Sequence, residues 1–331
     1  MKIIDTKATI QNRQRLRPHS IWSFVDDATR GQGFEAVSPG NGGARAFDAD
    51  LHLRLQPKFR FGRDLKIFAS GSCFAREVEL AFHQRGYKVL SWNPSLDISN
   101  DMFHRYNTFS IINDFEFAFQ RPYGPEYINR VGEGKFVDFS GYGTFTTADE
   151  VMALRQRIIE CHRRVVEADV VVVTLGLVEA WYDRQNGSYC NITPYALFAS
   201  QPDRFELRIT NYQENLEAVQ RFIEFLTRLH PTVKIVLTVS PVPFSDTFSG
   251  QDVIVANTYS KSVLRCVAQD LTELYDHVDY FPSYEIVMMS APAQSWLDDF
   301  RHVRRERVAF IVSEFERSYV EAAPAAAGTV G

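Results

Sequence analysis

The chain has 331 residues, of which 45% are hydrophobic and 23% charged, and its formal net charge is −5. This composition is typical of a globular protein with one large or two small domains. The small net charge provides no field that favours nucleic acid or an anionic membrane. No stretch approaches the ~20 apolar residues of a membrane span, and the first residues lack the apolar segment of a secretory signal. We therefore expect a cytoplasmic protein that binds neither nucleic acid nor membrane.

Four cysteines are spread widely along the chain, at Cys73, Cys161, Cys190 and Cys266. None is part of a C-x-x-C pair, so neither a zinc site nor a redox dithiol is expected. We expect reduced thiols and a site that needs no metal or organic cofactor. The 26 Phe and 14 Tyr residues predict a well-filled core and an aromatic-lined cleft.

The first predicted elements follow an irregular arm that comprises residues 1–60. This arm contains the turn-rich run 38–43, which favours a loop. A short apolar run at 66–69 then predicts a strand. Apolar residues at helical spacing follow from Phe74, and Gly86 ends that helix. Residues 87–90 predict a second strand.

Two segments interrupt the regular pattern. Residues 93–148 are rich in aromatic residues, Asn and Gly and show no long periodic helix, so we expect an insertion over the core. That insertion is either a substrate-covering element or a loose subdomain packed far from any site. Residues 183–208 form a second irregular excursion, and the Ala/Gly/Pro-rich tail 321–331 is expected to be disordered.

The rest of the chain alternates helices and strands. The best strand is 169–175, whose run of valines is typical of a strand buried on both faces. Thr210 and Gln213 resemble a capping box that opens a helix ending near Leu229. The remaining elements are a helix at 151–165, strands at 233–239 and 278–281, and helices at 252–275 and 303–319. This alternation predicts a three-layer α/β/α domain over 61–320, with a parallel sheet between helices.

Ligands of such sheets bind outside the carboxyl ends of the strands. Segments 70–75, 176–181 and 240–244 each follow a predicted strand, and Asp299 and His302 come just before the last helix. We therefore expect these segments, distant in sequence, to meet at one edge of the sheet.

The first of them places a glycine, a hydroxyl and a thiol where a strand gives way to a helix. Gly71 permits a tight turn. The N–H groups of the helix N-terminus should stabilise a Cys73 thiolate, lower its pKa and hold the oxyanion of a tetrahedral intermediate. The simpler alternative is that Ser72 only caps the helix and Cys73 is a small buried residue.

Asp299 and His302 are three residues apart, which lets the carboxylate reach the imidazole across one turn. Such a carboxylate fixes the tautomer of the ring and stabilises its protonated form. The alternatives are a solvated carboxylate beside a surface histidine, or Asp298 in place of Asp299.

Residues 174–181 offer further groups for a substrate. Gly176, leaving a buried strand, can present its backbone N–H, while Glu179 and Trp181 can bind polar and apolar parts of a substrate. An ordinary strand-to-loop turn with an exposed glutamate is the alternative.

Several motifs together resemble the GSCFA-domain family, which is grouped with the SGNH/GDSL hydrolases. Gly71 to Ala75 spell the family's signature, and the resemblance spans about 64–310. It also includes the runs 174–181, Ser240-Pro241-Val242-Pro243, Ala256-Asn257-Thr258-Tyr259-Ser260-Lys261 and Tyr280-Phe281-Pro282-Ser283-Tyr284-Glu285. The resemblance implies a flavodoxin-like three-layer fold and ester or acyl chemistry.

The Gly-Asp-Ser block of the superfamily, set against Gly71-Ser72-Cys73, puts Cys73 at the nucleophile, and a register shifted by one puts Ser72 there. Gly176 matches the Gly of the Gly-x-Asn-Asp block, but Val178 stands in place of the Asn. Asp299 and His302 match the final Asp-x-x-His block in full.

The resemblance thus implies an esterase or acyltransferase in which Cys73 or Ser72 attacks an acyl carbonyl, with His302 as base and Asp299 orienting it. The substrate is expected to be a small molecule or glycan that carries an acyl group, such as an acylated carbohydrate or a thioester. Because the Asn is absent, a non-catalytic protein that binds a glycan or an acylated metabolite is the alternative.

Overall fold

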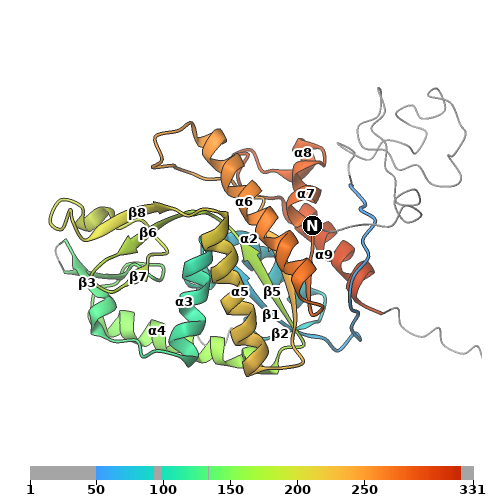
Figure 1. Cartoon of the computed structure of the whole chain (residues 1–331), viewed down its shortest axis with the longest axis horizontal. Helices are drawn as coiled ribbons and strands as arrows, with labels where there is room; N and C mark the ends of the chain where they lie inside the picture. Colours follow the sequence, from blue (N-terminus) through green and yellow to red (C-terminus); the bar gives the residue numbers. More distant parts are fainter. Residues whose placement is uncertain (1–49, 93–98, 133, 322–331) are drawn as a thin grey trace, which may run out of the picture.

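The structure, a computed structural model, describes residues 50–92, 99–132 and 134–321. Five parallel strands form its central sheet in the order β10-β9-β5-β1-β2, as Figure 1 shows. They are β1 (Lys66–Gly71), β2 (Lys88–Val89), β5 (Val170–Leu175), β9 (Lys234–Val239) and β10 (Val278–Tyr280). Numbered in chain order, this is the 2-1-3-4-5 order of flavodoxin-like folds. The predicted parallel α/β fold is confirmed.

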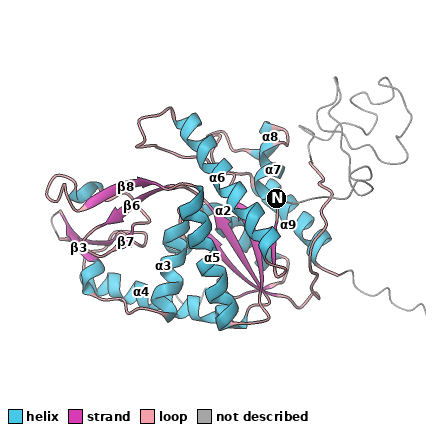
Figure 2. Ribbon diagram, in the orientation of Figure 1, coloured by secondary structure: helices cyan, strands magenta, loops and turns pink. Residues whose placement is uncertain are grey.

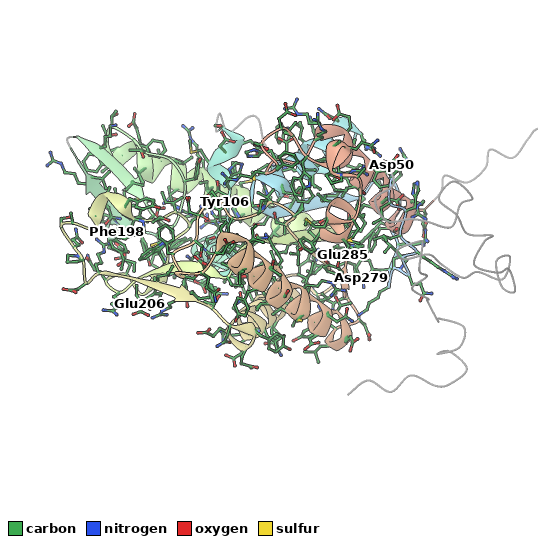
Figure 3. All side chains as sticks on the ribbon, turned by 90° about the horizontal axis from the view of Figure 1, so that it is seen from above. Asp50, Tyr106, Phe198, Glu206, Asp279 and Glu285 are labelled. Atoms are coloured by element: carbon green, nitrogen blue, oxygen red, sulfur yellow. The ribbon has the colours of Figure 1, made fainter. Side chains whose placement is uncertain are left out.

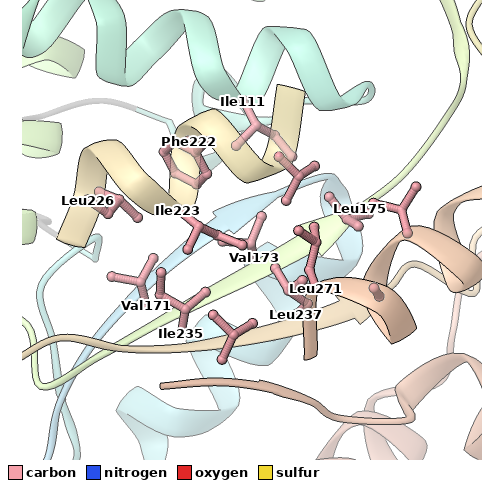
Figure 4. Close-up of a cluster of buried hydrophobic side chains, with 14 of the residues drawn as sticks. Ile111, Val171, Val173, Leu175, Phe222, Ile223, Leu226, Ile235, Leu237 and Leu271 are labelled. Atoms are coloured by element: carbon pink, nitrogen blue, oxygen red, sulfur yellow. The ribbon is translucent and has the colours of Figure 1, made fainter. Parts of the chain in front are cut away.

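Helices cover both faces of this sheet (Figure 2). On one face lie α3 (Thr108–Phe119), α5 (Tyr212–Leu229) and α6 (Val253–Leu274). On the other lie α2 (Cys73–Gln84), α7 (Ser283–Met288) and α9 (Arg305–Tyr319). The three layers follow from β5, all of whose residues are buried, because a strand with two apolar faces needs helices on both sides. Figure 4 shows Val171 and Val173 of β5 packed against Phe222 and Ile223 of α5.

The two predicted insertions build a lobe beside the sheet, at the left of Figure 1. It contains the hairpin β3 (Ile128–Val131) and β4 (Lys135–Asp138), and the antiparallel strands β6 (Glu179–Asp183), β7 (Ser188–Tyr189) and β8 (Phe205–Ile209). Its remaining elements are the short 3-10 helices η3 (Asn100–Phe103), η4 (Pro125–Tyr127) and η6 (Tyr195–Leu197). The description of 183–208 as irregular was therefore wrong, because it missed the short pairing of β6 with β7 and β8.

The expectation of no long helix in 93–148 was also wrong, since α3 has 12 residues. Asn107 opens this helix with a reciprocal capping box to Ser110. The helix packs between α4 (Ala148–Arg163) and α5, so apolar residues occupy several of its faces. A helix buried on several sides lacks the single apolar stripe that sequence periodicity detects.

Element boundaries differ from the predicted ones in a few places. The capping box of α5 uses Asn211 and Glu214 instead of Thr210 and Gln213. The Thr210 hydroxyl instead donates to the carbonyl of Val178 at 2.8 Å. Three short helices outside the insertions, η5 (Arg164–Glu167), α7 and α8 (Pro292–Ser295), were not predicted.

Of the predicted irregular arm, residues 50–60 contain no helix or strand but pack along α9. The ring of Phe59, for example, lies 5.7 Å from that of Tyr319, centroid to centroid. The rest of the arm and most of the predicted tail, 1–49 and 322–331, lie outside the described residues. Among the residues that are described, no helix combines the length and the apolar character needed to cross a membrane.

A network of buried charges joins the first insertion to α4. Asp114 on α3 contacts Arg105 at 2.6 Å and Arg155 at 2.5 Å. Arg155 on α4 also binds Asp138 of β4, again at 2.5 Å. All four side chains are buried, and each charge has an opposite charge beside it. This pairing offsets the cost of removing the charges from water.

Candidate active site

A pocket of about 600 Å³ lies at the carboxyl ends of β1, β5 and β9. All four segments that the sequence placed at this edge contribute to its wall, through Cys73, Gly176, Ser240 and His302. Both insertions line it as well, through residues such as Tyr106 and Tyr195. The expectation that distant segments meet here is met. The first insertion lines the pocket, so the alternative that it packs far from any site was wrong.

The turn after β1 brings the pocket wall close to the sheet. Gly71 has a φ of +149°, and a Cβ there would lie 2.7 Å from the backbone oxygen and Cβ of Thr174, so a side chain does not fit. Ser72 occupies the N-cap position of α2, yet its hydroxyl makes no capping hydrogen bond. Its Oγ lies instead 3.3 Å from Oγ of Ser240. The Ser72 hydroxyl therefore has no capping role.

Cys73 is the first residue of α2 and is partly buried at the pocket wall. Burial raises the pKa of its thiol, and this outweighs the lowering by the N–H groups of Phe74 and Cys73 and by Arg301. The expectation of a lowered pKa was thus wrong, because desolvation of the sulfur exceeds the effect of the helix N-terminus. A thiol in this state needs a base to become a nucleophile.

Asp299 and His302 form the predicted pair. The Oδ2 atom of Asp299 lies 2.5 Å from Nδ1 of His302, and its Oδ1 accepts hydrogen bonds from the backbone N–H of Arg301 and His302, both at 3.0 Å. Hydrogen bonds from His302 and Arg301 hold the pKa of the Asp299 carboxyl well below its usual range. Within the described part of the chain, Nε2 of His302 has no hydrogen-bond partner. That nitrogen is therefore available for proton transfer.

The loop around this pair is bent at Phe300, whose φ of 52° lies in the left-handed region. Phe300 is the only described non-glycine residue with a positive φ, and such backbone strain is concentrated at functional sites. Asp298, the competing carboxylate, forms an ion pair with Arg304, in which its Oδ1 lies 3.4 Å from a guanidinium nitrogen. The structure thus pairs His302 with Asp299 and not with Asp298.

The segment after β5 is held tightly in place. A Cβ on Gly176 would lie 2.2 Å from the carbonyl oxygen of Tyr106, so only glycine allows the first insertion to pack this closely. Glu179, at the start of β6, accepts hydrogen bonds from the hydroxyl of Thr247 (2.5 Å) and the N–H of Phe248 (3.0 Å). Its carboxylate thereby positions the loop that precedes α6.

Trp181 lines the outer part of the pocket together with other aromatic side chains. Its ring centroid lies 4.8 Å from that of Phe198 and 5.5 Å from that of Phe248. Tyr195 packs on Phe248 in turn, at 5.8 Å. We call Trp181, Tyr195 and Phe248 the aromatic wall, since all three line the pocket. Figure 3 shows Phe198 in the lobe and Tyr106 nearer the middle of the molecule.

A second Asp-x-x-His pair, which the sequence analysis missed, lines the same pocket. Nε2 of His104 lies 3.5 Å from Oδ1 of Asp101, and Nδ1 lies 3.3 Å from the hydroxyl of Tyr106. Burial lowers the pKa of His104 to about 4, so the ring is neutral at pH 7. The spacing equals that of Asp299 and His302, but its location in an insertion hid it.

Lys261 is another pocket residue that had no predicted role, although it ends one of the family motifs. Only 1% of its surface is exposed, and its Nζ donates to the carbonyl of Gly176 at 2.9 Å. Burial lowers the pKa of Lys261 to about 7. As for metals, no group of three or more His, Cys, Asp or Glu side chains in the described ranges is placed to hold an ion.

Solved structures that match this chain include a family two carbohydrate esterase from Clostridium thermocellum in complex with cellohexaose. It shares 11% identity with this chain at a TM-score of 0.34, over 80% of this chain and 65% of that one. A family 3 carbohydrate esterase from the same organism shares 11% identity at a TM-score of 0.31, over 76% of this chain and 94% of that one. A family 3 carbohydrate esterase from Talaromyces cellulolyticus shares 10% identity at a TM-score of 0.32, over 76% of this chain and 95% of that one.

No curated protein matches the chain in sequence. The sequence model of the GSCFA family, however, matches residues 66–315, a range that runs from β1 into α9 and includes every strand of the central sheet. The signature Gly71 to Ala75 and the Asp299/His302 pair both fall inside it. The chain therefore belongs to the GSCFA family.

Proposed function

We propose that this protein cleaves or transfers an acyl group, with Cys73 as nucleophile, His302 as general base and acid, and Asp299 as the residue that orients His302. The observation that carries the proposal is that one pocket is lined by a thiol at a helix N-terminus and by a histidine whose Nδ1 is bound to a carboxylate. These are the parts of a nucleophile–base–orienter site. The raised pKa of Cys73 fits a thiol that is deprotonated only as it attacks.

In the first step, the sulfur of Cys73 bonds to the acyl carbon while its proton moves to Nε2 of His302. The carbonyl electron pair shifts to oxygen and gives an oxyanion. When the carbonyl re-forms, the bond to the leaving alcohol or thiol breaks, and His302 returns the proton to that group. Water or an acceptor alcohol then attacks the acyl-thioester, losing its proton to His302. The acyl group leaves as an acid or a new ester, and the thiol is restored.

Ser72 is the competing nucleophile, because its hydroxyl also lines the pocket and makes no capping bond. Its 3.3 Å contact with Ser240 places a second hydroxyl beside it. In this version Cys73 is a neighbour that does not react, and the remaining chemistry is unchanged.

The aromatic wall supports an acylated carbohydrate as the substrate. Aromatic faces pack well against the C–H faces of a sugar ring, and a ligand site of this kind combines apolar walls with a few polar groups. Tyr195 is 60% exposed and Phe248 38% exposed, so both faces are open to a ligand. The acyl group would then reach Cys73 while the sugar rests on the wall.

A binding protein without turnover is the second candidate. It is favoured by Val178, which is buried where the family resemblance expects an amide that would hold the oxyanion. Such a protein would bind the acylated ligand and leave it intact.

The proposal is tested by measuring hydrolysis of acetylated sugars, aryl acetates and acyl thioesters by the wild type and by Cys73→Ala, Ser72→Ala, His302→Ala and Asp298→Asn. We expect a loss of at least about 10³-fold in kcat for His302→Ala and for the true nucleophile, since each removes a covalent or proton-transfer step. Asp298→Asn is the matched control for a carboxylate in the same loop and should keep full activity.

Iodoacetamide labelling followed by peptide mapping adds a readout that needs no substrate. The exposed Cys266 will react as well, so the experiment uses a Cys266→Ala background. Full activity of both Cys73→Ala and His302→Ala would contradict the mechanism. If His104→Gln abolishes turnover and His302→Ala does not, the base has been assigned to the wrong histidine. Tight ligand binding without turnover in the wild type would favour the binding protein.

A further inference from the structure

Lys261 has an environment unlike that of other buried cations of this protein. Arg76, Arg105 and Arg155 are also buried, and each has a carboxylate oxygen within 3.0 Å, from Glu79, Asp114 and Asp138. Lys261 is equally buried, but no described carboxylate lies within ion-pair distance of it. The one hydrogen bond that its Nζ makes to the described residues goes to a neutral carbonyl, that of Gly176.

A buried ammonium without a counter-ion opposes folding, because its hydration is lost and not replaced. An apolar side chain of similar length would fill the same space without this cost. We therefore expect the positive charge of Lys261 to have a function that a methionine or leucine at this position could not provide.

The position of the ammonium suggests that role. It sits on the carbonyl of Gly176, at the end of β5, and lines the same pocket as Ser72 and Cys73. The adjacent Ser260 accepts a hydrogen bond from the N–H of Val178 at 3.1 Å. Through these two contacts α6 holds the 176–178 segment and fixes the ammonium at the pocket wall.

Charge in the pocket also acts on this group. Ionisation of Cys73 raises the pKa of Lys261, so a negative charge at the reacting end of the pocket favours the ammonium form. An oxyanion formed on a carbonyl attacked by Cys73 or Ser72 would be a negative charge in this same region. The oxyanion would thus supply the counter-ion that the Lys261 ammonium lacks in the resting protein.

We propose that the Lys261 ammonium is the donor that stabilises the oxyanion during acyl cleavage, in the role that a side-chain amide would otherwise have. This inference rests on the proposed function, since it needs a tetrahedral intermediate. It assigns a catalytic role to a residue outside the Asp299/His302 pair and removes the reason to regard Val178 as a loss of catalysis.

The test compares kcat and KM of the wild type with those of Lys261→Met, Lys261→Gln and Lys88→Met on whichever ester or thioester the wild type turns over fastest. Loss of one oxyanion donor lowers kcat by about 10²–10³-fold. We expect this loss in Lys261→Met with KM changed less than about threefold, because the contact forms only in the transition state. Lys261→Gln supplies an amide N–H and should recover part of kcat. Lys88, exposed on β2, controls for loss of a lysine.

Lys261→Met should remain folded, since it replaces an unpaired buried charge by an apolar chain. Thermal unfolding and circular dichroism check this on the same samples. Wild-type kcat in a folded Lys261→Met variant would overturn the inference while leaving the proposed function intact. A rise in KM at constant kcat would overturn it too, because Lys261 would then bind the ground state. A wild type that cleaves no ester or thioester would overturn the proposed function, and this inference with it.

Discussion

The first insertion and the pocket differ in how they accommodate buried charge. In the first insertion, Asp114 of α3 lies between Arg105 and Arg155, and Asp138 of β4 completes the network. In the pocket, Lys261 is buried to the same extent, and its one hydrogen bond to described residues is to a carbonyl. Paired charges join the first insertion to α4 and need no other explanation. The unpaired charge is costly, and the cost is explained if the missing partner is a reaction intermediate.

The largest effect on stability is expected where the paired network is broken. Asp114→Ala leaves Arg105 and Arg155 buried near each other without the carboxylate between them. We expect a loss of about 3–5 kcal/mol in the free energy of unfolding, measured by chemical denaturation. Glu206→Gln, which breaks the surface ion pairs with Arg184 and Arg208, is the control and should change stability little. Equal losses in the two variants would mean that the buried network is no more important than a surface pair.

The opposite sign is expected at Lys261. Lys261→Met should raise the free energy of unfolding by about 1–4 kcal/mol below pH 7, because it removes a desolvated charge. The folded pKa of Lys261 is lowered to about 7, whereas the unfolded chain keeps a pKa near ~10.4. Between these values the unfolded chain binds more protons, so wild-type stability rises with pH relative to the variant.

The advantage of Lys261→Met should therefore be largest below pH 7 and shrink as the pH approaches 10. Cys73 is the titratable neighbour of Lys261, and burial raises the pKa of its thiol, so the thiol stays largely neutral over most of this pH range. Denaturation midpoints measured from pH 6 to pH 9.5 provide the check. A variant that is less stable than the wild type at every pH would show that Lys261 has a structural role.

The smallest effect on stability is expected at the exposed Asp299/His302 pair. Its charges are solvated, so Asp299→Asn should leave the unfolding midpoint nearly unchanged. The same substitution should lower kcat by about 10²–10⁴-fold, because the wrong tautomer of His302 is then favoured. Measured together, midpoint and kcat separate a catalytic pair from a structural one. A normal kcat would place Asp299 outside the mechanism.

Much of the fold could be predicted from local pattern. The unbroken valine run at 170–175 and the apolar stripe of the helix ending near Leu229 are both local signals, and the structure places each element within a few residues of its predicted bounds. Asp299 and His302 could be paired from their spacing together with their match to the Asp-x-x-His block. These features are determined by residues that are close together in the sequence, so the sequence alone was enough to predict them.

What could not be predicted depends on neighbours in space. The apolar residues of α3 cover several faces because α4 and α5 pack around it, so no stripe marks the helix. The pKa of Cys73 was given the wrong direction because burial, which sequence does not show, outweighs the helix N-terminus. No role for Lys261 could be predicted, because its hydrogen bond to the carbonyl of Gly176 joins residues that are 85 positions apart in the sequence.

The most direct test of the acyl-transfer site is to trap the acyl group on the protein. The Cys266→Ala variant is mixed with an aryl acetate, quenched in acid within the first turnover and digested for peptide mapping by mass spectrometry. We predict one acetyl group on the peptide that contains Cys73, absent from Cys73→Ala and reduced in His302→Ala. Acetyl on Ser72 would reassign the nucleophile within the same site. Hydrolysis that continues in a variant lacking both Ser72 and Cys73 would contradict the proposed site.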